Sequence, residues 1–297
     1  MPQIDTNNVT IEYEAFGAES DPIILLIMGL GMQLIAWPEP FCRDLADRGF
    51  RVIRYDNRDT GFSTKFDGVK APGIASLFLR STFRLPIRVP YTLRDMADDA
   101  AGLLEALDVQ GAHLVGASMG GMIAQNFAVR HPQRSLSLTS IMSTSGHRAL
   151  PAADPLVSRH LFHARPTSHD RETIIAHNMR TIELIGSPAY PIDEDTRREM
   201  CSLSFDRSFY PAGFMRHVAA IIEDGDRRER LKKITAPTMV IHGREDPLVP
   251  LAGGIDTAEH IPGARLEIFD GMGHNLPQPL WPQLIDLIAE NATSKRT

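Results

Sequence analysis

The chain has 297 residues, of which 43% are hydrophobic and 23% are charged, a composition typical of a globular protein rather than a disordered or fibrous one. Its formal net charge is −6 and its basic residues form no long run, so we expect no nucleic-acid partner. Cys42 and Cys201, its two cysteines, are too few for a disulfide framework or a zinc site and are expected to be buried free thiols.

The beginning of the sequence carries no signal for export. Residues 1–17, "MPQIDTNNVTIEYEAFG", lack the charged start and the apolar stretch of a signal peptide. The longest apolar run, residues 23–30, is too short to span a bilayer. We therefore expect a cytoplasmic protein without a membrane partner, whereas its oligomeric state stays open.

Short apolar runs bounded by turn residues alternate with helical patterns along much of the chain. Helical spacing ends at Gly49 in "EPFCRDLADRG", and a capping-box-like start at Thr92 and Asp95 opens the pattern that follows. This alternation predicts an α/β fold in which helices flank a mostly parallel, twisted sheet on both faces. The runs predict strands at residues 9–13, 23–28, 50–55, 112–115, 136–142, 238–241 and 265–269.

The alternation is interrupted twice. Residues 64–91 are punctuated by proline and glycine and contain the apolar and basic stretch "IASLFLRSTFRLPIRVPY". Residues 147–230 show several helical patterns separated by prolines and no convincing strand. We expect a core formed by residues 1–146 and 231–297, with residues 147–230 inserted as a helical lid over one end of the sheet. A helical domain unrelated to the chemistry is the alternative.

The segment "HLVGASMGGM", residues 113–122, has a serine between small residues where a strand meets a helix. Gly116, Ser118 and Gly120 fit the G-x-S-x-G nucleophile elbow, in which a sharp turn exposes the serine hydroxyl. The flanking glycines relieve clashes with the neighbouring strand and helix. Ser118 is therefore the candidate nucleophile, at the carboxyl end of the sheet where α/β proteins bind ligands.

A serine nucleophile needs a histidine base, which in turn needs a carboxylate that orients it. His274 stands in the glycine-flanked loop "FDGMGHNLP" after the last predicted strand, and Asp246 follows the preceding strand in "TAPTMVIHGREDPLVP". These residues are the candidate base and acid. Glu245 and Asp270 are the alternatives for the acid, although both are expected to be solvated loop charges.

The oxyanion of an acyl-transfer intermediate needs two backbone donors. We expect these to be the amides of Met119, directly after the nucleophile, and of Leu30, in the loop "MGLGMQ" after a core strand. Gly29 and Gly31 allow that loop to approach closely.

The elbow, the "GMGH" segment and "LLIMGLGMQLIAWPEPFCRDLADRGFRVIRYDNRDTGFST" together resemble the α/β-hydrolase superfamily, in particular the branch that contains aclacinomycin methylesterase. The resemblance covers residues 9–145 and 230–290. It implies the α/β-hydrolase fold, and the order Ser118, Asp246, His274 is the one that this superfamily uses.

Two departures from the superfamily pattern stand out. Met28-Gly29 replaces the His-Gly that many members carry at the oxyanion loop, which removes a side chain that props this loop. In "DNRDTGFS", residues 56–63, Asp59 replaces the first glycine of a D-x-R-G-x-G-x-S segment. Arg58 in this segment is expected to be structural rather than catalytic.

Substrate contacts are harder to assign. Gly29 and Trp37 are the tentative ones, Trp37 being as consistent with a core position as with a pocket wall. Core positions are favoured for Phe41, Phe205, Phe209, Tyr210, Phe214 and Met215. A metal site is not expected from the histidines of the insertion, which lack the spacing of ligands on one helix; they are His147, His160, His163, His169, His177 and His217.

These features predict a serine carboxylic ester hydrolase that forms an acyl-enzyme and needs no cofactor or metal. The resemblance implies a small-molecule ester that is bulky or lipophilic, such as a polyketide- or macrolide-type methyl ester or lactone. Cofactor-free perhydrolysis or C–C bond hydrolysis on the same fold is the alternative within the enzyme class. A ligand-binding receptor that retains the fold is the alternative outside it.

Overall fold

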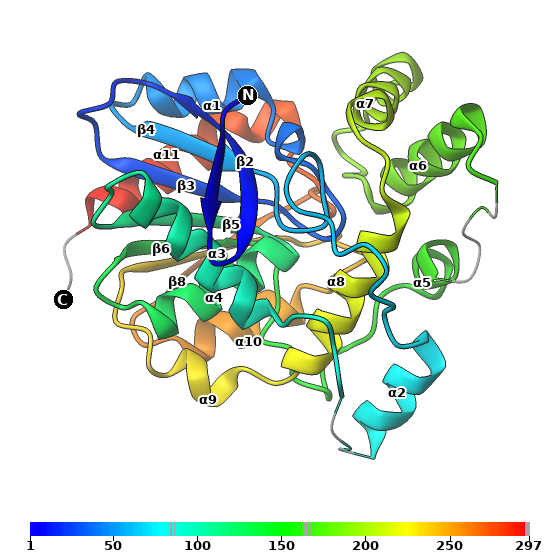
Figure 1. Ribbon diagram of the computed structural model, residues 1–297. Coiled ribbons are helices and arrows are strands. Elements are labelled where there is room, and N and C mark those ends of the chain that lie inside the picture. Colours follow the sequence, from blue (N-terminus) through cyan, green and yellow to red (C-terminus); the bar gives the residue numbers. More distant parts are fainter. Residues whose placement is uncertain (84, 86, 163–165, 167, 295–297) are drawn as a thin grey trace.

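The computed structural model describes residues 1–83, 85, 87–162, 166 and 168–294. Its centre is an eight-stranded sheet in the order β1-β2-β4-β3-β5-β6-β7-β8 (Figure 1). The β1–β2 and β2–β4 pairs are antiparallel, whereas all other neighbours are parallel. The strands are β1 Gln3–Thr6, β2 Val9–Phe16, β3 Ile23–Ile27, β4 Arg51–Tyr55, β5 Ala112–Ala117, β6 Ser135–Ile141, β7 Thr238–Gly243 and β8 Arg265–Phe269.

The predicted mostly parallel sheet is confirmed, and each predicted strand is present. The sequence patterns missed β1, a four-residue edge strand in which every residue is at least partly accessible. Without a buried face, such a strand has no run of apolar residues to reveal it.

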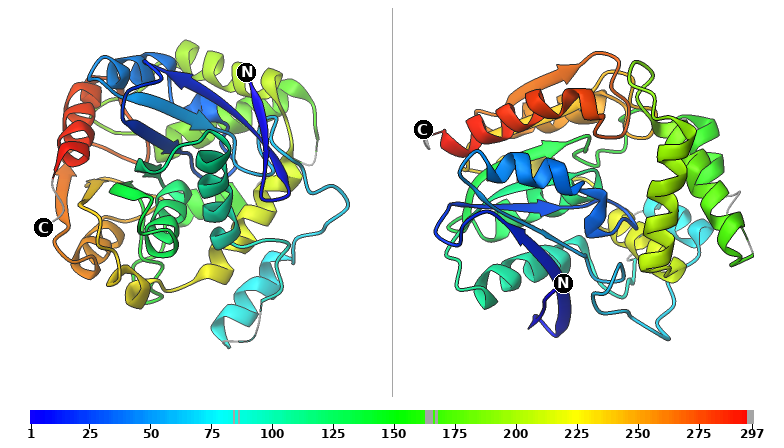
Figure 2. Two further views of the ribbon diagram at one scale, coloured as in Figure 1. Left: turned by 60° about the vertical axis from the view of Figure 1, so that its left-hand side comes forward. Right: turned by 90° about the horizontal axis from the view of Figure 1, so that it is seen from above.

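Helices cover both faces of the sheet, which is seen from two further directions in Figure 2. Helices α3 and α4 pack on one face, α1 and α11 on the other. No helix among the described residues combines the length and the apolar character needed to cross a bilayer. The α-helices are α1 Glu39–Ala46, α2 Ile74–Thr82, α3 Leu93–Ala106, α4 Met119–Arg130, α5 Pro155–Phe162, α6 Arg171–Ile185, α7 Glu194–Arg207, α8 Pro211–Asp224, α9 Arg228–Leu231, α10 Ala252–His260 and α11 Trp281–Thr293, and the 3₁₀ helices are η1 Leu34–Ala36 and η2 Gln278–Leu280.

Strand β3 explains why the sheet needs helices on both sides. All five of its residues are buried. Ile23, Leu25 and Ile27 belong to the cluster under α3 and α4. Ile24 and Leu26 face the opposite cluster under α1 and α11. Because successive strand side chains point to opposite faces, an apolar run without alternation requires two covered faces.

Residues 147–230, called the insertion from here on, contain helices and no strand within their described part. Helices α5–α8 gather at one end of the sheet, together with α2 (Figures 1 and 2). Helices α6 and α7 share a small apolar cluster of Ile175, Met179 and Cys201. Both cysteines are buried and free, as predicted. That the insertion acts as a lid stays a prediction.

Strand order reverses beside β3, which has β4 on one side and β5 on the other. Ligands of open α/β sheets bind in the crevice at such a reversal, outside the carboxyl ends of the strands. The loop after β3 carries the predicted oxyanion donor Leu30, and the turn after β5 carries Ser118. The topology therefore brings these two segments to one place.

Candidate active site

Ser118 occupies the turn between β5 and α4 with φ 56° and ψ −120°. Few non-glycine residues adopt a positive φ, and such strain persists only where the surroundings enforce it. Here the Ser118 amide donates to the Ile141 carbonyl of β6 at 2.9 Å. The Ser143 hydroxyl donates to the Ser118 carbonyl at 2.8 Å. The strained turn is thus held by the neighbouring strand and the loop that follows it.

Gly116 and Gly120 are both required by close backbone approaches. A Cβ on Gly116 would lie 2.2 Å from the Gly120 carbonyl oxygen, and one on Gly120 would lie 2.0 Å from the Ile27 carbonyl oxygen. Any larger residue would push α4 away from the sheet. The sequence interpretation of these two glycines agrees with this packing.

His274 lies between the two other residues of the predicted triad. Its Nδ1 is 2.6 Å from Oδ2 of Asp246 and its Nε2 is 2.9 Å from Oγ of Ser118. An ionised carboxylate can only accept hydrogen bonds, so Nδ1 carries the proton and Nε2 accepts the Ser118 hydroxyl. The side chain is thereby oriented to take a proton from Ser118.

The Asp246 carboxylate is buried, and its two oxygens have different hydrogen-bond partners. Its Oδ1 accepts the amides of Leu248 and Val249 at 2.9 and 2.8 Å, which leaves Oδ2 for His274. The alternatives for the acid have other partners: Glu245 accepts the Gly271 amide, and Asp270 pairs with Arg244. Both are exposed. The geometry therefore favours Asp246.

The loop after β3 lies directly beside the nucleophile. A Cβ placed on Gly29 would be 3.2 Å from the Ser118 Cβ and 3.7 Å from its Oγ. The Asn57 side chain donates to the Met28 carbonyl at 2.9 Å and so ties this loop to the segment after β4. Within the described residues, the amides of Leu30 and Met119 donate to no protein acceptor. Their role as oxyanion donors stays a prediction.

The His274 loop is bonded to the insertion rather than only to the sheet. The His274 amide donates to the Ile185 carbonyl at 2.7 Å, at the end of α6. The buried Ser187 hydroxyl accepts the Gly273 amide at 2.9 Å and donates to Oδ1 of Asn275 at 2.5 Å. Nothing in the sequence pointed to Ser187, because a lone serine after a helix carries no signal of a partner so distant in the chain.

Arg58 is structural, as expected. Its guanidinium forms two hydrogen bonds with the carboxylate of Asp99 on α3, at 2.6 and 2.5 Å, and both side chains are buried. It also lies over the rings of Phe66 and Tyr91. These contacts occupy the guanidinium, and none of them involves a residue of the predicted triad.

Asp59, the departure from the superfamily glycine, is a buried ion-pair partner of the insertion. It has φ 66° and receives two hydrogen bonds from Arg216 of α8, at 2.7 and 2.8 Å. Burial alone would raise the pKa of Asp59, but the bonds from Arg216, the Phe66 amide and Tyr91 outweigh it and lower that pKa. The carboxylate is therefore ionised at neutral pH, and the substitution joins the segment after β4 to α8.

The two tentative substrate contacts differ in accessibility. Gly29 lies beside Ser118, whereas Trp37 has no exposed surface and stacks on Phe41 with a centroid distance of 5.8 Å. The interpretation of Trp37 as a pocket wall is therefore wrong. Its ring belongs to the apolar cluster under α1 and α11, in agreement with the alternative that Trp37 is a core residue.

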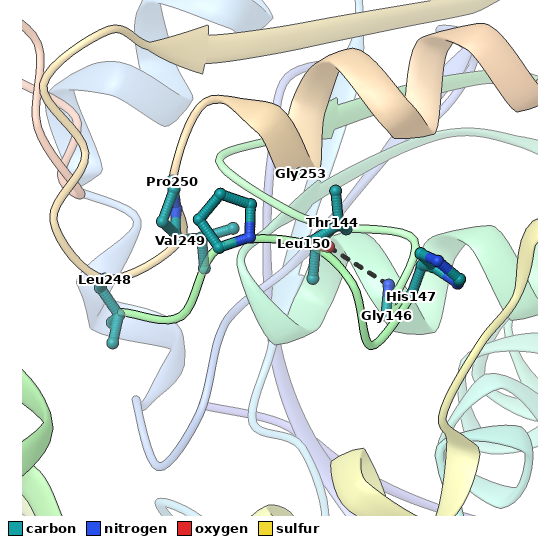
Figure 3. A pocket seen from close by; sticks show the side chains of 9 residues that line it. Thr144, Gly146, His147, Leu150, Leu248, Val249, Pro250 and Gly253 are labelled. Carbon is teal, nitrogen blue, oxygen red and sulfur yellow. Dashed lines mark hydrogen bonds between the residues drawn. The ribbon is translucent and has the colours of Figure 1, made fainter. Parts of the chain in front are cut away.

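A cavity of about 200 Å³ lies between the loops that follow β6 and β7 (Figure 3). Its lining includes Leu248 and Val249, whose amides bind Asp246, but neither Ser118 nor His274. The cavity therefore backs the acid loop rather than containing the candidate nucleophile. The lining residues are Thr144, Gly146, His147, Leu150, Pro151, Leu248, Val249, Pro250 and Gly253.

One group of side chains in the described part of the chain has potential metal-ligand atoms close together: Asp256, Glu259 and His260 on α10. The Asp256 carboxylate already pairs with the Arg228 guanidinium and accepts the Ser145 hydroxyl. A cation there would have to displace Arg228, so the group does not form a convincing metal site.

Of the insertion's histidines, His163 lies outside the described residues.

Comparison with known proteins agrees with this fold and geometry. Residues 22–172 match the α/β hydrolase fold family. The chain is 30% identical over 294 residues to rhodomycin D methylesterase DauP of Streptomyces sp. (strain C5), with 92% of both chains covered. The chain belongs to the α/β-hydrolase family. The predicted fold and the resemblance to a methylesterase branch are thus confirmed.

Two further similarities are to a second hydrolase and to the solved structure of an enol-lactonase. The 2-hydroxy-6-oxononadienedioate/2-hydroxy-6-oxononatrienedioate hydrolase of Cupriavidus pinatubonensis (strain JMP 134 / LMG 1197) is 32% identical over 174 residues, which are 58% of this chain and 59% of that one. The enol-lactonase from Burkholderia xenovorans LB400 superposes with a TM-score of 0.74 at 22% identity, covering 99% of this chain and 100% of that one. The latter likeness concerns the fold alone.

Proposed function

We propose that the protein is a serine carboxylic ester hydrolase that works through an acyl-enzyme. The observation that carries this proposal is the position of His274, whose two ring nitrogens bond Asp246 and Ser118 at 2.6 and 2.9 Å. This is the arrangement that activates a serine hydroxyl, which is otherwise a weak nucleophile.

In the first half-reaction, Oγ of Ser118 attacks the ester carbonyl carbon while Nε2 of His274 takes its proton. The carbonyl oxygen becomes an oxyanion within reach of the Leu30 and Met119 amides. The tetrahedral intermediate then expels the alcohol, which receives the proton from His274, and the acyl group stays on Ser118. Asp246 stabilises the imidazolium throughout.

In the second half-reaction, water attacks the acyl-enzyme carbonyl and gives its proton to His274. Collapse of the second intermediate releases the carboxylic acid and returns the proton to Ser118. Each backbone donor of an oxyanion site typically contributes about 3 kcal/mol to lowering the barrier.

For the substrate we propose a bulky or lipophilic small-molecule ester, such as a polyketide- or macrolide-type methyl ester or lactone. The support is the similarity to rhodomycin D methylesterase over 92% of the chain. A panel of short p-nitrophenyl esters, rhodomycin D and macrolactones tests this proposal. Turnover of short esters alone would count against a bulky substrate.

Hydrolysis of a C–C bond is the second candidate, because the chain is 32% identical over 174 residues to the 2-hydroxy-6-oxononadienedioate/2-hydroxy-6-oxononatrienedioate hydrolase. That compound therefore belongs in the same panel. Its turnover with a kcat/KM above that of every ester would replace the ester proposal.

The decisive experiment compares the wild type with Ser118→Ala on the best ester of the panel. We expect kcat to fall by about 10³-fold or more, as in enzymes that lose the nucleophile of a triad. A fluorophosphonate probe should label the wild type and not the variant. Wild-type activity in Ser118→Ala would refute the mechanism, and labelling without steady-state turnover would indicate a receptor that retains the fold.

A further inference from the structure

We propose that His217, from the insertion helix α8, is a positioning residue that props the oxyanion loop, residues 28–33. This inference rests on the proposed function, because only in that function does the loop stabilise an oxyanion. Met28 and Gly29 begin this loop, so no histidine of the segment itself is available for that role.

The imidazole of His217 joins two core segments through its two nitrogens. Its Nδ1 lies 3.2 Å from the Gly31 amide, and its Nε2 lies 2.8 Å from the Arg58 carbonyl oxygen. A carbonyl only accepts, so Nε2 carries the proton and Nδ1 accepts the Gly31 N–H. Each nitrogen therefore has one defined partner.

The ring is held in the neutral form that this arrangement needs. His217 is fully buried, and burial lowers its pKa to about 4. Protonation of Nδ1 would turn the acceptor of the Gly31 amide into a donor. At neutral pH the bond to the oxyanion loop is therefore retained.

The Gly31 amide, which donates its hydrogen bond to His217, belongs to a tight turn. The Met32 amide donates to the Gly29 carbonyl at 3.2 Å, and Gly31 has φ 67°. In a turn of this kind, the peptide between the two central residues, Leu30 and Gly31, can flip and thereby change the turn type. Fixing the Gly31 amide fixes that peptide, and with it the turn that presents the Leu30 amide to the site.

Helix α8 is itself placed firmly enough to act as a support. Arg216, next to His217, forms the buried ion pair with Asp59. A Cβ on Gly213 would lie 2.2 Å from the Asp59 carbonyl oxygen, so the helix backbone contacts this segment directly. Phe214, one turn before His217, lies 2.9 Å from the position of a Cβ on Gly31. The same face of α8 thus packs against the loop that His217 bonds.

Two substitutions separate the hydrogen bond from packing. His217→Leu removes both polar atoms, whereas His217→Asn keeps an acceptor near the position of Nδ1. We expect His217→Leu to lower kcat per titrated active site by roughly 10- to 100-fold, with KM within about twofold of the wild type, since the oxyanion forms only during reaction. His217→Asn should recover most of that loss.

His113→Asn is the matched control, because His113 is a buried histidine in β5 that bonds Ser137 at 3.0 Å. It should lower the thermal midpoint without changing kcat per titrated site. Equal kcat losses in His113→Asn and His217→Leu, or an equal loss in both His217 variants, would overturn the proposal.

Two readouts do not depend on ester turnover. Exchange of the Gly31 amide hydrogen and the rate of labelling by a fluorophosphonate, whose adduct places an oxygen in the oxyanion site, are measured in both His217 variants. We expect faster exchange and slower labelling in His217→Leu than in the wild type. If both rates are unchanged, the His217 proposal fails, whereas a wild type that labels without hydrolysing esters contradicts the proposed function alone.

Discussion

Ser118 and Asp246 are fixed by bonds within the sheet core, whereas the oxyanion loop and the His274 loop are each bonded to the insertion. The Ser118 turn is held by Ile141 and Ser143, and Asp246 by the amides of its own loop. The Gly31 amide bonds His217 of α8, and the His274 amide bonds the end of α6. The insertion thus bonds two of the loops that form the candidate site.

The two regions also differ in how they are stabilised. Two large apolar clusters hold the sheet and its helices together, but α6 and α7 share a cluster with only three buried members. Polar contacts also join the insertion to the core: Arg207 at the end of α7 bonds Asp56, Glu12 and Gln33 of the core. Loss of one such buried contact should therefore weaken the attachment of the insertion to the core.

The largest effect is expected from a change in the core alone. Asp246→Asn keeps an oxygen for the Leu248 and Val249 amides but cannot hold His274 in the same tautomer, so kcat should fall by about 10⁴-fold with the fold intact. Steady-state kinetics and circular dichroism check both parts. Asp270→Asn, which removes an exposed charge paired with Arg244, is the control and should leave kcat unchanged. A loss below tenfold in Asp246→Asn would transfer the role of the acid to another carboxylate.

A smaller effect is expected where the core meets the insertion. Asp59→Asn tolerates the positive φ but leaves Arg216 buried without its charge partner, which should lower the free energy of unfolding by about 3 kcal/mol. Urea denaturation measures this change. Asp206→Asn breaks an exposed ion pair with Arg171 inside the insertion and should cost less than about 1 kcal/mol. Equal costs would mean that the buried pair does not hold the insertion to the core.

The structure brings together Ser118, Asp246 and His274, the three side chains that the sequence predicted as a triad. A serine between glycines at a strand end, an aspartate after the next strand but one and a histidine in the last loop each follow from the needs of one mechanism. The sequence also showed that Asp59 was unusual. The sequence could not show why an aspartate stands there, since the partner of Asp59, Arg216, is 157 residues away in the chain.

The contacts made by the insertion could not be predicted for the same reason. Helical patterns in the sequence predict that α6 and α8 exist. They do not predict which residues of the core each helix contacts. Trp37 illustrates a related limit, because a large aromatic side chain suits a core and a pocket wall equally well in sequence. Only its complete burial against Phe41 distinguishes the two.

The smallest effect is expected from a single hydroxyl of the insertion. Ser187→Ala removes the acceptor of the Gly273 amide and the donor to Asn275, which leaves the His274 loop less constrained. We expect kcat per titrated site to fall by about tenfold, which corresponds to roughly 1.4 kcal/mol in the barrier. Ser208→Ala is the matched control, because Ser208 also lies in the insertion and its hydroxyl donates to the Gly61 carbonyl of the core. This variant should keep its kcat. If both variants keep wild-type kcat while losing similar stability, the insertion only covers the His274 loop. A loss confined to Ser187→Ala would instead mean that the insertion positions the catalytic base.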